Sequence, residues 1–297
     1  MCAASLSAIL TIITECCGPR SSSYYTFHQR VRTIAHVQLS DIQEHYRRTH
    51  TSDNLRFVIA GKMAGRKAQI KRMLESWQLP RGERFAVPHD ELHSGKPTLI
   101  RRKEASNLTF GWSMEIPREL SDKEDAALDC LNHILTGTMH SRIFGKARKQ
   151  GMAYGMFSDG SVGKYESSWD FGGEVECDKA ERLFALIVSE LQAVLRGEIT
   201  EAELEAAKSY GLGRYQMGAQ TVAQISGFYT GRFFWGGYVK DYAKGPQEIK
   251  GTTLEQMNAV AREFIAANTW ALAGVSSGER SDIVRLGEQL EGLFTQG

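Results

Sequence analysis

The chain has 297 residues, of which 42% are hydrophobic and 24% are charged. This length suits one large domain or two small ones, and the composition is typical of a globular protein that buries a core. The formal net charge of +1 gives no general attraction to nucleic acid, to membranes or to acidic partners. No apolar run reaches the roughly 18 residues that a membrane-spanning helix needs. We therefore expect neither a nucleic-acid partner nor a membrane partner.

Residues 1–37 are expected to be an N-terminal arm or the remnant of a preceding domain. Residues 3–13 are small and apolar, but no Lys or Arg precedes them, so they make a poor secretory signal. The segment is either a loosely attached arm or the false start of a longer reading frame. The five cysteines form no C-x-x-C pair, which favours a reducing compartment. On this basis the chain is expected to be cytoplasmic.

Several helix starts are marked by capping boxes. In a capping box, a Ser, Thr or Asp side chain and a Glu or Gln three residues later satisfy each other's free backbone donors. Five such pairs predict helices along the chain: Ser40 with Gln43, Ser121 with Glu124, Asp178 with Glu181, Thr200 with Glu203, and Thr253 with Gln256. The third helix carries an apolar stripe and is expected to stop at Gly197.

Runs rich in β-branched and aromatic residues predict strands between these helices. The predicted strands are residues 55–60, 108–114, 153–158, 168–175 and 270–275. Residues 80–97 are rich in Pro and Gly and are expected to form an extended connection. A short turn at residues 159–163 joins two consecutive strands. The pattern predicts an α+β fold, with an antiparallel or mixed sheet covered on one face by helices.

The sequence offers no obvious hydrolytic centre. It has neither a G-x-S-x-G turn nor a Walker-type loop. His89 and His93 have a helical spacing, but Glu91 fits neither H-E-x-x-H nor H-x-x-E-H, and nearby prolines oppose a helix. The other closely spaced histidines are read as surface or packing residues: His45, His50, His133 and His140. We therefore predict no catalytic metal site in this chain, and an independent enzyme that uses His89 and His93 is the remotest reading.

The most specific stretch is residues 141–155, which read S-R-I-F-G-K-A-R-K-Q-G-M-A-Y-G. It resembles the S-R-L-F-x-x-x-R-x-x-x-G-L-A-Y segment of insulinase/pitrilysin-type metallopeptidases. Two further segments are similar to the same family in the same order: D-N-L-R-F-V-I-A-G at 53–61 and G-E-I-T-E-A-E-L-E-A-A-K at 197–208. The resemblance covers residues 38–297, which we expect to be one domain of that family.

This resemblance implies the metal-free half of a pair. In such peptidases two homologous α+β domains enclose a chamber: the first binds zinc through H-x-x-E-H and a later Glu, and the second supplies the opposite wall. The present sequence is similar to the second, so zinc is expected only on a partner or missing N-terminal domain. That domain sits on another chain, was lost, or belongs to a longer reading frame. The expected partners are a peptide substrate and a zinc-binding homologous domain or subunit, or further copies of this chain.

Two residues carry the chemistry that the resemblance implies. By motif match, Arg148 and Tyr154 correspond to an Arg and a Tyr that reach the bound peptide near the zinc. A guanidinium offers donors to a peptide carbonyl or carboxylate, and a phenol can donate to a developing oxyanion. The family motif has one residue more between the two than this chain has, so the turn that joins them is shorter here. The plainer alternative is a solvated helix-end cation and a core tyrosine, while Arg142 is expected to cap or salt-bridge a helix end.

The sequence thus predicts a non-catalytic, substrate-enclosing domain of an insulinase-type zinc metallopeptidase, which needs an H-x-x-E-H partner for proteolysis. The alternative is a catalytically dead structural subunit, because members of the superfamily serve as scaffolds in respiratory complexes. The presence of both Arg148 and Tyr154 favours the first reading.

Overall fold

The computed structural model of the protein describes residues 27–86 and 91–294. These residues divide into two compact bodies. The first body comprises the described residues 91–213 and 245–294, and the second comprises 27–86 and 214–244. None of the described helices has the length and apolar character that a membrane span requires.

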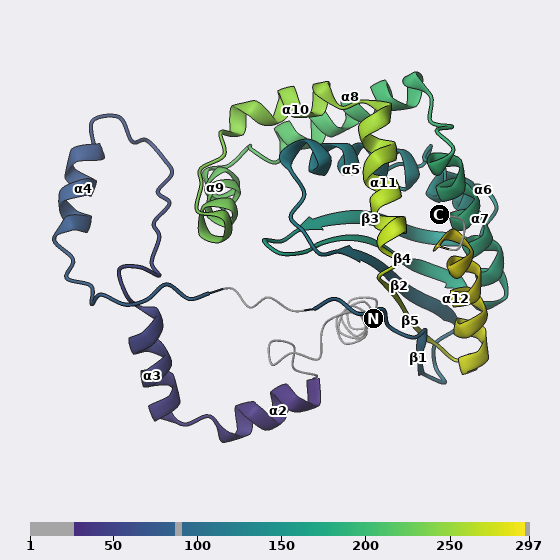
Figure 1. Ribbon diagram of the computed structural model, residues 1–297, viewed down its shortest axis with the longest axis horizontal. Helices are drawn as coiled ribbons and strands as arrows, with labels where there is room; N and C mark the ends of the chain where they lie inside the picture. Colours follow the sequence, from purple (N-terminus) through teal and green to yellow (C-terminus); the bar gives the residue numbers. More distant parts are fainter. Residues whose placement is uncertain (1–26, 87–90, 295–297) are drawn as a thin grey trace. The chain divides into compact units, whose positions relative to one another are not determined.

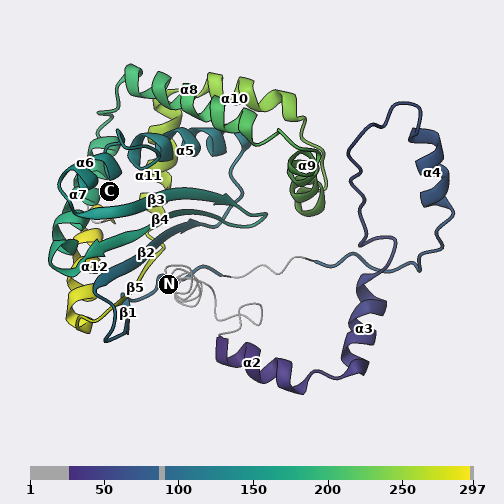
Figure 2. The ribbon, with the colours of Figure 1, turned by 180° about the vertical axis from the view of Figure 1, so that it is seen from behind.

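The first body is built on a five-stranded sheet. Its strands are β1 (Thr98–Arg101), β2 (Asn107–Ile116), β3 (Ala153–Val162), β4 (Ser167–Glu176) and β5 (Trp270–Ser276). Their order across the sheet is β1-β5-β2-β4-β3, so β1 and β3 form the two edges (Figures 1 and 2). The pairing of β1 with β5 is parallel and the other pairings are antiparallel. The predicted mixed sheet is confirmed.

Helices cover one face of this sheet. Those of the first body are α5 (Asp122–Leu135), α6 (Phe144–Lys149), α7 (Ala180–Leu195), α8 (Glu201–Met217, whose last residues fall in the second body), α10 (Gly245–Gly251), α11 (Leu254–Ala267) and α12 (Arg280–Phe294), with a 3₁₀ turn η1 at Cys177–Lys179. Alternate residues of β2, such as Phe110 and Trp112, are at most 1% exposed. Phe110 packs on Phe184 of α7, and Trp112 on Phe294 of α12. The helices thereby bury the apolar side of the sheet, as predicted.

Three of the predicted capping boxes form and two do not. Ser121, Thr200 and Thr253 each exchange hydrogen bonds with the residue three positions later. The helix predicted from Asp178 begins instead at Ala180, because residues 177–179 form the 3₁₀ turn first. The helix predicted from Ser40 begins at Leu39, since Gln38 and Asp41 form its capping box. Gly197 ends α7 in a left-handed conformation (φ +76°), which favours Gly.

The second body contains α2 (Phe27–His36), α3 (Leu39–Thr49), α4 (Lys67–Glu75), α9 (Val222–Gly236) and the 3₁₀ turn η2 (Tyr242–Lys244). Arg84 donates a hydrogen bond to the carbonyl of Phe234 (3.1 Å), and Arg56 donates to that of Phe233. Arg56 also lies over the ring of Phe233, 4.8 Å from its centroid. Two cations thus bind the carbonyl end of α9, where the helix dipole favours positive charge.

The strand predicted at residues 55–60 is wrong. These residues are irregular in the structure, and no strand pairs with them among the described residues. Phe57 and Ile59 are 44% and 46% exposed, and none of residues 55–60 is fully buried, so the segment has no face packed in the core. A β-rich sequence needs both a pairing edge and a packed face to become a strand, and this segment has neither.

Two smaller differences concern the sheet edges. Strand β1 was not predicted, because it is only four residues long and follows Pro97. The turn predicted at residues 159–163 lies further along, because β3 continues to Val162 and Gly163 donates to the carbonyl of Glu166 (2.8 Å). At the outer edge of β3, the backbone N–H of Ser158 donates to Thr136 Oγ1 at 2.7 Å.

Candidate functional site

The candidate site lies where α6 leads into the edge strand β3. With six residues, α6 is too short to be stable alone, and no side chain caps its N-terminus. It is fixed instead by the preceding turn, in which the N–H groups of Arg142 and Ile143 donate to the carbonyls of Ile134 and Leu135, both at 2.8 Å. Ile143 and Ala147 are fully buried. The packing therefore anchors α6 through these two residues and leaves Lys146, Arg148 and Lys149 exposed.

A tight turn connects α6 to β3. Gly151 has φ +63°, a left-handed conformation that costs Gly least. The N–H of Met152 donates to the carbonyl of Ala147 at 2.8 Å, which closes the turn. The connection is therefore held by backbone hydrogen bonds.

A β-bulge at the start of β3 exposes Tyr154. Ala153 pairs with Val175 and Gly155 pairs with Glu174, so Tyr154 is the extra residue of the bulge. Bulges of this kind re-aim a side chain. Tyr154 is 81% exposed, whereas its neighbour Ala153 stays in the core. The alternative of Tyr154 as a core residue is therefore wrong.

The structure brings the two predicted residues together. Arg148 Nη1 donates a hydrogen bond to the backbone carbonyl of Tyr154 at 3.0 Å. The Arg148 guanidinium carbon also lies 5.7 Å from the centroid of the Tyr154 ring, within the range of a cation–π contact. The shorter turn has not separated the pair. Arg148 is also exposed. Guanidinium N–H groups and the Tyr154 hydroxyl are therefore available to a ligand at the same place on the surface.

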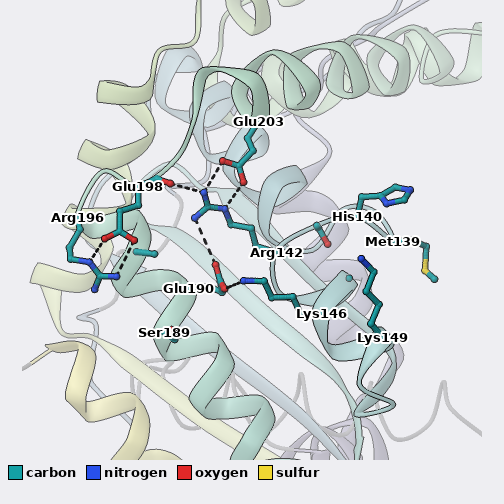
Figure 3. Close-up of a pocket in the computed structure, with 13 residues that line it drawn as sticks. Met139, His140, Arg142, Lys146, Lys149, Ser189, Glu190, Arg196, Glu198 and Glu203 are labelled. Carbon is teal, nitrogen blue, oxygen red and sulfur yellow. Dashed lines mark hydrogen bonds and ion pairs between the residues drawn. The ribbon is translucent and has the colours of Figure 1, made fainter.

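On the other side of α6, Arg142 binds the start of α8 (Figure 3). Its Nε and Nη2 donate to the two carboxylate oxygens of Glu203 at 2.6 and 2.7 Å, and Nη2 also donates to the carbonyl of Glu198 at 2.6 Å. The hydrogen bond from Arg142 lowers the pKa of Glu203 to about 2, and the same bond raises the pKa of Arg142. The expectation that Arg142 salt-bridges a helix end is confirmed.

A polar pocket of about 570 Å³ lies beside this network. It is lined by α6, by the second half of α7 and by the start of α8, and its lining includes Lys146, Lys149 and Glu190 but neither Arg148 nor Tyr154. Glu190 is only 6% exposed, and its carboxylate pairs with Lys146 (Figure 3). Sequence reasoning missed Glu190. The available signal was a Glu inside the apolar stripe that runs through Ile187, Leu191 and Val194 of α7.

A second charged region lies on the face of the sheet opposite the apolar core. Asp159 of β3 and Asp170 of β4 are directly opposite each other, and Glu115 lies on β2. Burial, reinforced by the charges of Glu166 and Asp170, raises the pKa of Glu115 to about 8. Burial also raises the pKa of Asp170. Glu115 is therefore largely protonated at neutral pH.

The structure offers no zinc site within residues 27–86 and 91–294, where no group of three or more His, Cys, Asp or Glu side chains could hold a metal ion. His89 lies outside the described residues. His93 is exposed and lies 4.0 Å from Glu91. The residues described therefore do not fit the zinc that an insulinase-type peptidase would carry.

Comparison with known proteins adds the family. The sequence profile of the family described as "Peptidase M16 inactive domain" matches residues 36–210, which is more than half of the chain. A search of curated proteins found no match.

Solved structures share the fold at low sequence identity. The chain is similar to a protease from Helicobacter pylori, with 16% identity and a TM-score of 0.67 over 82% of this chain and 60% of that one. It is also similar to a peptidase M16 inactive domain from Pseudomonas fluorescens, with 16% identity and a TM-score of 0.71 over 92% and 66%. A chain of complex III2 from Candida albicans gives 9% identity and a TM-score of 0.78 over 97% and 71%.

The chain spans less than two thirds of the length of the first two of these structures. The S-R-I-F-G-K-A-R segment, the mixed sheet under its helices and the profile match over residues 36–210 agree with one another. The chain therefore belongs to the Peptidase M16 inactive domain family.

Proposed function

We propose that this chain is a non-catalytic, substrate-enclosing domain of an insulinase-type zinc metallopeptidase, which holds an extended peptide through Arg148 and Tyr154. The observation that carries the proposal is the contact of these two exposed side chains at the bulged start of β3. A peptide backbone offers carbonyl oxygens and, at its end, a carboxylate. Both are acceptors, and the site presents donors.

The arrangement is pre-organised for such a role. The hydrogen bond from Arg148 to the Tyr154 carbonyl restrains a long side chain that would otherwise lose rotamer freedom on binding a peptide. The guanidinium keeps further N–H groups for a ligand, because it has five donors in a planar fork. The exposed phenol of Tyr154 adds a donor close by. The pair can bind and orient a peptide, but it contains no group that activates water.

Proteolysis therefore requires a partner in this proposal. The described residues do not fit zinc. We therefore place the metal and the activated water on a homologous H-x-x-E-H domain, which is either an N-terminal domain of the same protein or a separate subunit. Membership of the family supports this assignment. No reaction step is assigned to the residues of this chain beyond holding and orienting the substrate.

The proposal is tested by peptide binding to the full chain. Fluorescein-labelled β-casein peptides are titrated with wild type, Arg148→Ala and Lys149→Ala, and their fluorescence anisotropy is measured. Loss of a charge-assisted hydrogen bond should weaken binding by about tenfold in Arg148→Ala. Lys149 is the next exposed cation of α6, so Lys149→Ala controls for general electrostatic attraction and should bind within about twofold of wild type. Equal affinity of wild type and Arg148→Ala would contradict the proposal.

The second candidate function is a structural subunit that has lost catalysis. It is supported by the similarity to a chain of complex III2 from Candida albicans over 97% of the present chain, with a TM-score of 0.78. At 9% identity this similarity concerns the fold alone. A scaffold does not need a peptide site, so this function predicts that none of the three proteins binds the casein peptides.

A further inference from the structure

We infer that Glu190, a buried carboxylate of α7, is a positioning residue that holds α6 so that Arg148 is presented beside Tyr154. The inference rests on the proposed function, since it concerns the same peptide site. Glu190 lies outside that site and acts on it through Lys146.

The first observation is that Glu190 is a buried charge with cationic partners at one place. Its side chain is 8% exposed, and its carboxylate pairs with Lys146 of α6. Its other oxygen lies 3.8 Å from Nη1 of Arg142, two residues before α6 begins. A buried carboxylate is tolerated only when it is paired, since removing a charge from water is strongly unfavourable. Burial of Glu190 therefore favours the arrangement in which α6 lies against α7.

The second observation is the geometry of α6 itself. Lys146 and Arg148 are two residues apart, so on a helix their side chains point roughly 200° apart. Lys146 thus faces α7 while Arg148 faces away, toward the start of β3. Figure 3 shows Lys146 and Arg142 converging on Glu190. One short helix thus carries the ion pair with Glu190 on one side and the peptide contact on the other.

The third observation is that α6 is short, so one ion pair is a sizeable part of what holds its orientation. It has only six residues, and no side chain caps its N-terminus. The backbone bonds of residues 142 and 143 fix where α6 starts, and buried Ala147 holds one side of the helix against the core. The pair from Lys146 to Glu190 holds the side that faces α7, and the pair from Arg142 to Glu203 acts just before the helix. Of the two acidic partners, Glu190 is the one that contacts a residue within α6.

The test compares Glu190→Gln with Glu181→Gln in the full chain. Gln keeps the size of Glu190 and removes its charge. Glu181 lies on the same helix but pairs with Arg285 of α12 at 3.0 Å, away from α6, so it is the matched control. Titration with fluorescein-labelled β-casein peptides should show binding weakened by about five- to tenfold in Glu190→Gln, and unchanged binding in Glu181→Gln. Hydrogen exchange should become faster at the amides of α6 and stay unchanged in β2.

A double variant separates positioning from a general loss of stability. If Glu190 acts through Arg148, Glu190→Gln should weaken binding no further once Arg148→Ala is present, because coupled residues are non-additive. Additive effects would contradict the inference. The inference would also be contradicted if Glu190→Gln bound the peptides like wild type while Arg148→Ala bound them more weakly. If Arg148→Ala itself binds like wild type, the proposed function fails before the positioning role is reached.

Lys146→Met gives a second approach, which removes the ion pair at its α6 end. The Lys146 side chain is 52% exposed, and Glu190 keeps its contact with Arg142 in this variant. Lys146→Met should weaken peptide binding to a similar degree, and its melting temperature checks that it is folded at the temperature of the titration. Wild-type affinity in a folded Lys146→Met would overturn the inference.

Discussion

The two bodies of this chain use similar residues in different ways. In the first body, large side chains such as Trp112 and Trp169 are at most 1% exposed. In the second body, residues of the same kind lie at the surface: Trp77 is 49% exposed and Ile34 is 72% exposed. The family profile spans parts of both bodies, since it covers residues 36–210. The match to the family therefore does not show which body carries the hydrophobic core. The burial of side chains in the structure shows that the first body does.

The largest expected effect is the loss of a core tryptophan. Trp169 packs on Phe171 and Phe264, and its indole N–H donates to Asn132 at 2.8 Å. Trp169→Ala should lower the free energy of unfolding by about 3–5 kcal/mol. Trp77→Ala, in the second body, should change it by about 0.5 kcal/mol or less, because that side chain is already exposed. Urea denaturation followed by circular dichroism measures both, and equal losses would show that the two bodies do not differ in this way.

A pH-dependent effect is expected at Glu115 of the first body. Its folded pKa of about 8 lies above the ordinary value of 4.5, so the folded state favours the protonated carboxyl. Stability from this group is complete below pH 4.5 and is lost as the pH rises toward 8 and beyond. At pH 9, Glu115→Gln should therefore be more stable than wild type by about 4 kcal/mol.

At pH 4 the gain from Glu115→Gln should vanish. Glu83→Gln changes an exposed residue of the second body, and it should leave the free energy of unfolding within about 0.5 kcal/mol of wild type at both pH values. Urea denaturation at pH 4 and pH 9 tests this. A gain of equal size at both values would mean that ionisation of Glu115 is not the cause.

The smallest expected effect compares two helix caps of the same chemistry. Thr253 caps α11 in the first body and Thr221 caps α9 in the second, each in a box with a Gln three residues later. Thr253→Ala should reduce the stability of the first body by about 1 kcal/mol, because α11 packs on its core through Phe264.

Thr221→Ala should instead fray α9 locally. Hydrogen exchange measured by mass spectrometry distinguishes the two results. In Thr221→Ala, faster exchange should be confined to the first turn of α9. In Thr253→Ala, exchange should become faster across the β-sheet. Sheet-wide loss of protection in Thr221→Ala would show that the two bodies unfold as one unit.

The sequence predicted most of the first body because its signals are local. A capping box such as Ser121 with Glu124 involves residues three apart, and runs rich in β-branched and aromatic residues identify β2 and β4 on their own. The segment at residues 55–60 failed for the opposite reason. Its β-branched residues favour an extended backbone. A strand also needs a free sheet edge to pair with, however, and no local pattern shows whether one lies next to it.

The candidate site shows the same division. The motif match identified Arg148 and Tyr154, and the structure places them in contact. Sequence could not show that a bulge turns Tyr154 outward, because register is set by the partner strand. Nor could it pair Lys146 with Glu190, which are 44 positions apart.

The contact between Thr136 and Ser158 has a consequence for how copies of the protein behave together. β3 is a ten-residue strand at the edge of the sheet, and an open edge of this length is a template on which further strands can add. Thr136 takes the Ser158 N–H near the middle of that edge, and its hydroxyl also lies 2.7 Å from the Ser158 hydroxyl. A single threonine after α5 thus occupies one of the backbone donors that a strand added at this edge would need, which makes the edge a poorer template for pairing between copies.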